Sequence, residues 1–90
     1  MKIVLLSKRI GTTLTGRDSA LKLKNEMLAL DHPVQLDFSG VKTMSYPFAE
    51  TFFGRLANDH GPEIFASRIR IKNMQPRCRA MVDLILKKAA

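Results

Sequence analysis

The spacing of hydrophobic residues alternates between the period of a β-strand and that of an α-helix along the whole chain. Strand-like runs occur at residues 3–6, 34–38 and 68–72, and a helix-like stripe follows each of them. This order predicts an α/β domain with right-handed crossovers and a largely parallel or mixed sheet of three to four strands flanked by three helices. Because 90 residues leave room for one hydrophobic core, we expect residues 1–90 to form a single small domain.

The three strand-like runs differ in how many of their faces are apolar. Residues 3–6 form an uninterrupted apolar run, which is typical of a strand covered on both faces. Residues 34–38 and 68–72 alternate apolar with polar side chains, so each should bury one face only. We therefore expect the helices to cover the sheet unevenly. Residues 8–14 could supply a short additional edge strand.

Each helix-like stripe begins near a residue that is suited to cap a helix. Thr15, Ser45 and Asn73 carry side-chain oxygens that can accept a hydrogen bond from a free backbone N–H. Pro47 would lie in the first turn of the second helix, where its missing N–H costs nothing. Four of the five phenylalanines fall within residues 38–53, so we expect the centre of the core there. The inward stripe of the last helix should comprise Cys78, Met81, Val82 and Ile85.

The net charge of +7 is distributed unevenly along the chain. Residues 1–30 contain six basic and two acidic residues, and residues 31–63 contain two basic and five acidic residues. Residues 64–90 contain seven basic residues and one acidic residue. A basic protein thus has an acidic middle third, which suggests two surfaces with different partners.

The basic C-terminal third contains a candidate anion-binding cluster. Its members are Arg68, Arg70, Lys72, Asn73, Arg77 and Arg79. A cationic strand face beside the start of a helix can bind phosphate groups. Sheet-based RNA-binding domains also expose aromatic side chains, which this strand lacks, so nucleic-acid binding here should be weak and salt-sensitive. A nucleic-acid-binding module is the alternative function.

The sequence lacks the sets of residues that an enzyme active site, a metal site or a disulfide bond would need. Cys78 is the only cysteine, and with two isolated histidines it cannot complete a four-ligand zinc site. Asp37 and Glu50 could form a carboxylate pair, but their separation is not fixed by the sequence. We expect no catalytic residues, cofactor or metal. The apolar run at residues 3–6 is too short for a membrane span or a signal peptide, so we expect a cytoplasmic protein without membrane contact.

The segment that follows the second strand carries a family resemblance. Residues 36–53 read LDFSGVKTMSYPFAETFF. This segment resembles the strand–loop–helix segment of STAS domains, the anti-sigma-factor antagonist family, in which a strand end precedes a hydrophobic residue, Asp-Ser-Ser and an amphipathic helix. It is more similar still to bacterial STAS-like domains of unassigned function, in which a strand ending Leu-Asp-Phe-x-Gly-Val precedes a helix beginning Phe-Ala-Asp/Glu. Further matches are Leu14, Arg17 and Ala20 in the first helix region, and Ile69, Ile71 and Asn73 in the last strand and turn.

The resemblance implies a regulatory protein-binding module that is not an enzyme. In the antagonist family, a partner kinase phosphorylates a serine at the start of this helix and thereby switches partner binding. Here Tyr46 and Pro47 occupy the two serine positions, so the family's switch is not carried over. Ser45 remains a candidate phosphorylation site, and its alternative interpretation is a helix cap.

The partner implied by the resemblance is a histidine-kinase-type ATPase or another signalling protein. It would bind the loop at residues 40–47 and the exposed side of the following helix. The candidate partner contacts are Ser45, Tyr46, Pro47 and Glu50. The supporting residues are Asp37 and Gly40, which would shape the turn after the strand, and Phe48 and Phe52, which would anchor the helix. Formation of a homodimer stays open.

Overall fold

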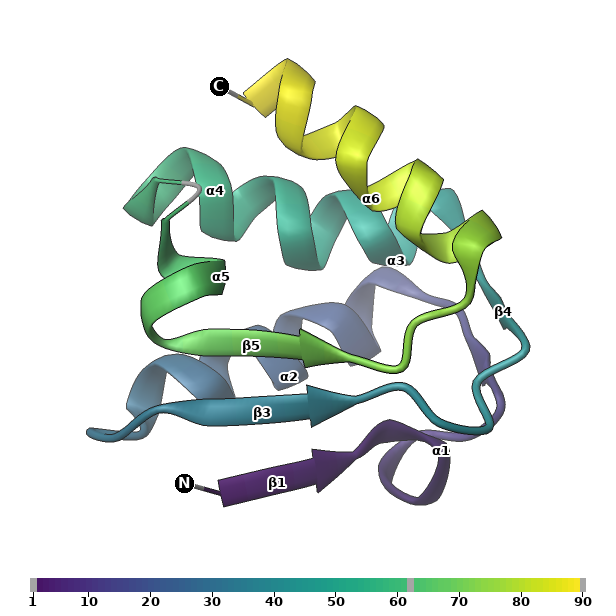
Figure 1. Cartoon of the computed structure of the whole chain (residues 1–90). Helices are drawn as coiled ribbons and strands as arrows, with labels where there is room; N and C mark the ends of the chain where they lie inside the picture. The colour runs from purple at the N-terminus through teal and green to yellow at the C-terminus, as the bar shows by residue number, and fades with distance from the viewer. Residues whose placement is uncertain (1, 62, 90) are drawn as a thin grey trace.

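Three parallel strands form the main sheet of the protein. The computed structural model describes residues 2–61 and 63–89. Strands β1 (Lys2–Leu5), β3 (Val34–Asp37) and β5 (Ile69–Lys72) lie in the order β1-β3-β5 (Figure 1). Both neighbouring pairs are parallel, with β3 in the centre. The predicted α/β architecture with a largely parallel sheet is confirmed.

A second, smaller sheet pairs two short segments that lie far apart in the sequence. Strand β2 (Thr13–Leu14) runs parallel to β4 (Thr43–Met44). The additional strand expected within residues 8–14 is therefore present, but it does not extend the main sheet. Its pairing with β4 fixes the loop that enters the second long helical run.

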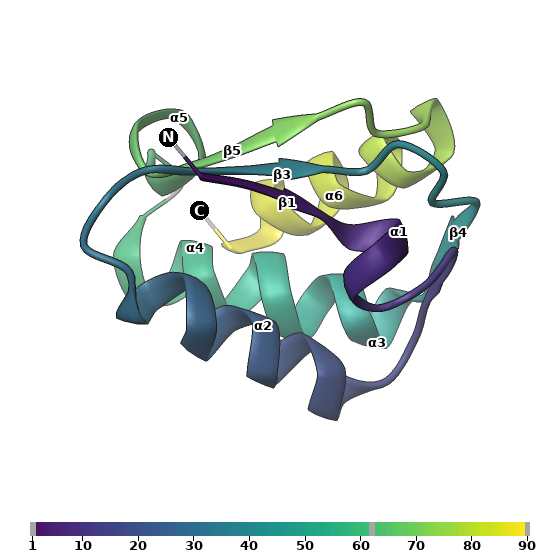
Figure 2. The ribbon, with the colours of Figure 1, turned by 90° about the horizontal axis from the view of Figure 1, so that it is seen from below.

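Besides the main sheet, the described part of the chain contains seven helical elements. They are α1 (Leu6–Arg9), α2 (Arg17–Ala29), α3 (Tyr46–Ala49), the π-helical segment η1 (Glu50–Gly54), α4 (Arg55–His60), α5 (Ile64–Ser67) and α6 (Pro76–Ala89). Because α3, η1 and α4 follow one another without a break, residues 46–60 form a single continuous helix, called the long helix below. Figure 2 shows that α2 and the long helix lie on the same side of the sheet, whereas α6 packs against the long helix beyond the β5 edge (Figure 1).

Only one face of the main sheet is therefore covered by helices. Val4, Leu36 and Ile69 are buried on the covered face, whereas Ile3 on the other face is 61% exposed. The expectation that residues 3–6 are covered on both faces is wrong. Leu6 is buried because it has left the strand and begins α1. The expected uneven coverage of the sheet is confirmed.

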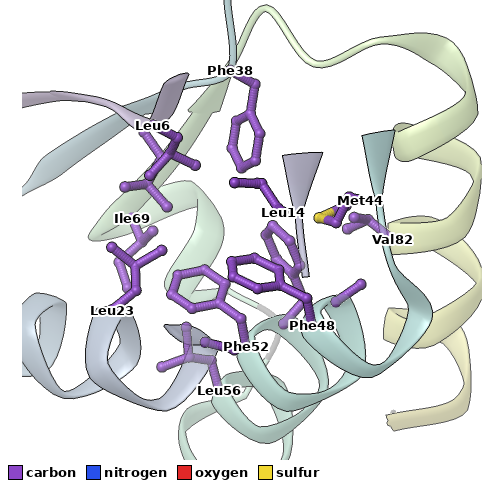
Figure 3. Packing of buried hydrophobic residues seen from close by; sticks show 14 of the residues in the cluster. Leu6, Leu14, Leu23, Phe38, Met44, Phe48, Phe52, Leu56, Ile69 and Val82 are labelled. Carbon is purple, nitrogen blue, oxygen red and sulfur yellow. The ribbon is translucent and has the colours of Figure 1, made fainter. Parts of the chain in front are cut away.

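The hydrophobic core fills the space between the covered face of the sheet and the helices. Phe38 from the end of β3 and Phe48 and Phe52 from the long helix point toward one another in its centre (Figure 3). The rings of Phe52 and Phe53 meet edge to face at a centroid distance of 4.9 Å. The predicted position of the core centre is thus confirmed. From α6 the core receives Cys78, Val82 and Ile85, while Met81 is half-buried.

The three predicted helix caps differ in outcome. The Ser45 hydroxyl accepts a hydrogen bond from the backbone N–H of Phe48 at 3.2 Å, which confirms this cap. The prediction for Thr15 is wrong, since α2 begins two residues later, after Gly16 at φ +88°. The pairing of β2 with β4 keeps the chain extended just before this point.

Asn73 also has a different role from the one predicted. Helix α6 begins at Pro76, so Asn73 is not its cap. Asn73 instead adopts a left-handed conformation with φ +61° in the turn after β5. Asparagine tolerates this conformation better than most residues.

Candidate functional site

The carboxyl ends of β3 and β5 are joined through the side chain of Asp37. Its Oδ1 atom accepts a hydrogen bond from Asn73 Nδ2 at 3.0 Å and another from the Ser39 backbone N–H at 2.9 Å. The bond from Asn73, followed by those from Ser39, holds the pKa of Asp37 below its ordinary value, because these bonds favour the charged form. Asp37 thus shapes the strand-end turn.

The turn after Asp37 depends on a glycine. The Val41 N–H donates to the Phe38 carbonyl oxygen at 3.0 Å, and Gly40 has φ +83° at the third position of this turn. Such a turn requires a positive φ there, which glycine adopts without steric cost. A Cβ atom at Gly40 would also lie 3.4 Å from the Ser7 side chain.

Backbone hydrogen bonds to the segment around β2 and contacts with the core both fix the loop at residues 40–47. Lys42 N–H donates to the Thr12 carbonyl at 2.7 Å, and Ser45 N–H donates to the Leu14 carbonyl at 2.8 Å. Val41 and Met44 are buried in the core. The exposed side chains of this loop are Lys42, Thr43, Tyr46 and Pro47, and the exposed candidate contacts among them lie in the first turn of the long helix.

The four candidate partner contacts differ in solvent exposure. Ser45 is half-buried and its hydroxyl caps the helix, while Pro47 is exposed in the first turn. Tyr46 is 41% exposed, which is unusual for a large hydrophobic side chain in this protein, and Glu50 is exposed one turn further on. The two supporting phenylalanines, Phe48 and Phe52, lie on the opposite, buried side of the same helix.

A groove runs between the long helix and α6 beside Tyr46. Its volume is about 150 Å³ and its lining consists of Tyr46, Glu50, Gly54, Asn58, Ile85 and Lys88. The first four follow one another at intervals of four along the long helix, and the last two come from α6. The structure thus brings two of the predicted contacts, Tyr46 and Glu50, together with residues near the C-terminus.

Gly54 determines how closely the two helices can approach. A Cβ atom at Gly54 would lie 3.2 Å from Ile85 Cγ2, which is tighter than an ordinary contact. Gly54 is also the last residue of η1, and π-helical segments inside α-helices occur frequently at functional sites. Ile85 occupies the space into which a side chain at Gly54 would project, so the two helices pack closely at the groove.

A second hollow lies on the other flank of the long helix. Its volume is about 260 Å³ and its lining consists of Arg17, Glu50, Thr51, Gly54, Arg55 and Asn58. Glu50, Gly54 and Asn58 line both hollows and form the ridge between them. Among the described residues Glu50 has no ion-pair partner, although Arg17, Arg55 and Lys88 line the same hollows.

Several residues of this surface were not identified from the sequence. Gly54, Asn58, Ile85 and Lys88 complete the groove, and Leu84 beside Ile85 is 51% exposed. The one available signal was a glycine within an otherwise strong helical stripe. No local sequence pattern indicated that α6 would line the groove, because its packing against the long helix is a tertiary contact.

The predicted basic cluster is not assembled as one surface. Arg68 Nη2 donates to the carbonyl oxygens of Leu28, at 3.2 Å, and Leu30 at the end of α2. Arg79 pairs with Asp83 at 3.1 Å. Both guanidinium groups are thus engaged within the protein.

The remaining members of that cluster lie in different places. Arg70 and Lys72 are exposed on the uncovered face of the sheet, and Arg77 is exposed in the first turn of α6. The Asn73 side chain donates a hydrogen bond to Asp37. The grouping of these residues in the sequence therefore does not correspond to a single anion site.

Other chemical features of the described residues are sparse. Within residues 2–61 and 63–89, no group of three or more His, Cys, Asp or Glu side chains is arranged to hold a metal ion. Cys78 is buried, and this burial raises the pKa of its thiol and disfavours the reactive thiolate. In the same part of the chain, no helix combines the length and the apolar character needed to cross a membrane.

Comparison with known proteins identifies a family. The family described as "STAS-like domain of unknown function" matches residues 19–77, which is more than half of the chain. The match includes β3, β4, the long helix and β5, and therefore Tyr46, Glu50 and Gly54. No curated protein and no solved structure matched the chain in the corresponding comparisons.

Proposed function

The chain belongs to the family of STAS-like domains of unknown function, and from this premise we propose that it is a non-enzymatic regulatory module that binds a partner protein. The groove between the long helix and α6, together with its rim residue Tyr46, is the proposed binding site. The observation that carries the proposal is that Tyr46 and Glu50, two of the contacts that the family resemblance implies, line one groove together with Ile85 and Lys88 of α6.

The groove has features that suit protein recognition. Exposed Tyr46 can supply a rigid aromatic contact with a polar end, a residue type enriched in the energetic centres of interfaces. Leu84 on α6 adds a second exposed apolar side chain beside the groove residue Ile85. Glu50, which lines the groove, would pair with a basic side chain of the partner.

The partner that we propose is a histidine-kinase-type ATPase, as the STAS resemblance implies. Regulation could act through Ser45, whose hydroxyl is already the acceptor of the helix cap. A phosphate on Ser45 would place negative charge at the N-terminus of the long helix, where it is electrostatically favourable, and one turn from Glu50, where it is unfavourable. Phosphorylation would therefore alter the charge at the end of the groove without requiring a new fold.

The test is affinity capture with the folded protein and with variants of the groove. The Tyr46→Ala and Glu50→Lys variants should each lose a partner that the unchanged protein retains from an extract of its own source cells. The captured protein is then tested for ATP binding. Capture of a partner without nucleotide binding would reject the ATPase assignment and leave the groove as the binding site.

Matched controls lie away from the groove. Lys22→Ala truncates an exposed side chain on α2, and Asp31→Lys makes the same charge change as Glu50→Lys at an exposed position before β3. Both controls should retain the partner. If Tyr46→Ala and Glu50→Lys retain every protein that the unchanged chain captures, the groove is not the binding site.

A further inference from the structure

The uncovered face of the main sheet presents two complete rows of side chains. The strand register places Ile3, Gln35 and Arg70 side by side in one row. It places Leu5, Asp37 and Lys72 in the next row. Side chains alternate between faces along a strand, so both rows point away from the buried residues Val4, Leu36 and Ile69. Figure 2 shows α2 and the long helix on the other side.

The chemistry of this face changes from one strand to the next. On β1, Ile3 is 61% exposed and Leu5 is half-buried. On β5, two strands away, Arg70 and Lys72 are exposed. The uncovered face is therefore apolar along one edge and cationic along the other.

The cations on β5 are not neutralised within the described part of the protein. Asp37 lies opposite Lys72 in the register, yet its Oδ1 atom accepts from Asn73 and Ser39 and forms no ion pair with Lys72. Arg70 has no ion-pair partner among the described residues either. This differs from Arg68 and Arg79, which are both engaged.

We propose that the uncovered sheet face docks an acidic amphipathic helix of a partner protein. The apolar stripe of that helix would cover Ile3 and Leu5, and its carboxylates would pair with Arg70 and Lys72. A helix is the usual layer that covers the free face of such a sheet. The net charge of +7 would also draw an acidic partner toward the protein.

Two other occupants fit this face less well. A second copy of the chain would bring two molecules of charge +7 together, and the one carboxylate on the face is already hydrogen-bonded. A nucleic acid would pair with the two cations, but Ile3 and Leu5 offer neither charge nor an aromatic ring for a base to stack on. Both occupants become outcomes of the test.

The proposal is tested by binding of a synthetic helical peptide of about 18 residues that carries a leucine stripe flanked by a row of glutamates. Binding is measured by fluorescence anisotropy at about 0.15 M salt, and the site is mapped by amide chemical-shift changes. We expect saturable binding with shifts centred on Ile3, Gln35 and Arg70. A second peptide with lysine in place of every glutamate should bind at least about tenfold more weakly.

Substitutions on the face provide the decisive comparison. Arg70→Gln combined with Lys72→Gln should weaken binding of the acidic peptide by about fivefold, and Ile3→Gln by a similar factor. Lys22→Gln combined with Lys87→Gln makes the same charge change on the helical layer and should leave the affinity within about twofold. Tyr46→Ala should also leave it unchanged, since the groove of the proposed function lies on the helical layer.

The proposal is overturned if the acidic peptide does not bind, if its shifts map to the helices, or if the substitutions at Arg70, Lys72 and Ile3 have no effect. It is also overturned if a single-stranded oligonucleotide binds this face and the acidic peptide does not. Concentration-dependent dimerisation through the same residues, measured by sedimentation, would equally replace the proposed occupant by a second copy.

Discussion

Individual polar side chains near the site act mainly on the backbone around them. Ser45 caps the long helix, and Asp37 joins the turns after β3 and β5 through Ser39 and Asn73. Arg68 binds carbonyl groups at the end of α2, which a helix leaves without partners of its own. Each of these residues therefore has a structural role that must be separated from any role in binding.

Substitutions of Ser45 can separate the cap from partner recognition. Ser45→Ala removes the hydroxyl that accepts from Phe48 N–H, so we expect the free energy of unfolding to fall by about 1 kcal/mol. Ser45→Asp retains an acceptor and should preserve stability, while altering partner capture through its charge. Chemical denaturation measures the first effect. Equal loss of stability in both variants would contradict the capping role.

The pKa of Asp37 offers a second prediction at the level of a single residue. Asn73→Gly removes the side-chain donor and keeps the positive φ, so the pKa of Asp37 should rise toward its ordinary value of 3.8. Carboxyl carbon NMR titration measures this pKa directly. An unchanged pKa would show that Asn73 does not hold the carboxylate in solution.

The same lowered pKa sets the direction of a pH dependence. Because the folded state holds Asp37 charged more strongly than the unfolded state does, its stabilising contribution is present above pH 3.8 and is lost as the pH falls through the lowered folded value. Acid unfolding of the unchanged protein should therefore lose more stability below pH 3.8 than acid unfolding of the Asn73→Gly variant.

Among the elements, the long helix is the one that connects the core with the proposed site. Its buried side contributes Phe48, Phe52 and Phe53, and its exposed side contributes Tyr46 and Glu50. The π-helical segment and Gly54 lie where this helix meets α6. The width of the groove is thus coupled to the packing of two helices.

Gly54 variants test this coupling between packing and the groove. Gly54→Val should destabilise the protein by about 1–3 kcal/mol, because its side chain would press against Ile85 and displace α6. Gly54→Ala adds one methyl group and gains helix propensity of up to about 1 kcal/mol, so its net effect should be small. Thermal unfolding measures both. A Gly54→Val variant as stable as the unchanged protein would show that α6 is not closely packed at this point.

At the scale of the whole molecule, the small hydrophobic core limits which core substitutions the folded protein can tolerate. The radius of gyration is 11.7 Å, and Phe38, which follows β3, packs with the phenylalanines of the long helix in the core to which every major element contributes. The two proposed binding surfaces lie on opposite sides of this core. One is formed by helices and the other by the free face of the sheet.

Truncation of a central aromatic side chain tests this dependence. Phe52→Ala should cost about 3–5 kcal/mol, a large part of the total of about 5–15 kcal/mol typical of a folded domain. We expect a partly unfolded protein at 25 °C by circular dichroism. Tyr46→Ala on the exposed side of the same helix serves as the control and should remain folded. Comparable stability of the two variants would contradict the central position of Phe52.

The sequence by itself determined the order of the three main strands and the three long helical runs, a largely parallel sheet, the position of the core and the Ser45 cap. These properties follow from the alternation of side chains along a strand or helix and from local hydrogen bonding, which operate over a few residues. Tyr46 and Glu50 were likewise predicted as partner contacts from a contiguous segment.

The tertiary structure alone decided which face of the sheet is free, how β2 pairs with β4, and that α6 completes the groove. It also decided the partners of Arg68 and Asn73, which lie 38 and 36 residues away in the sequence at Leu30 and Asp37. The uninterrupted apolar run at residues 3–6 predicted coverage on both faces. Coverage, however, depends on where each crossover places its helix, and here α2 and the long helix lie on one side of the sheet, while α6 packs against the long helix beyond the β5 edge. Such contacts join residues far apart in the chain, so local spacing carries no information about them.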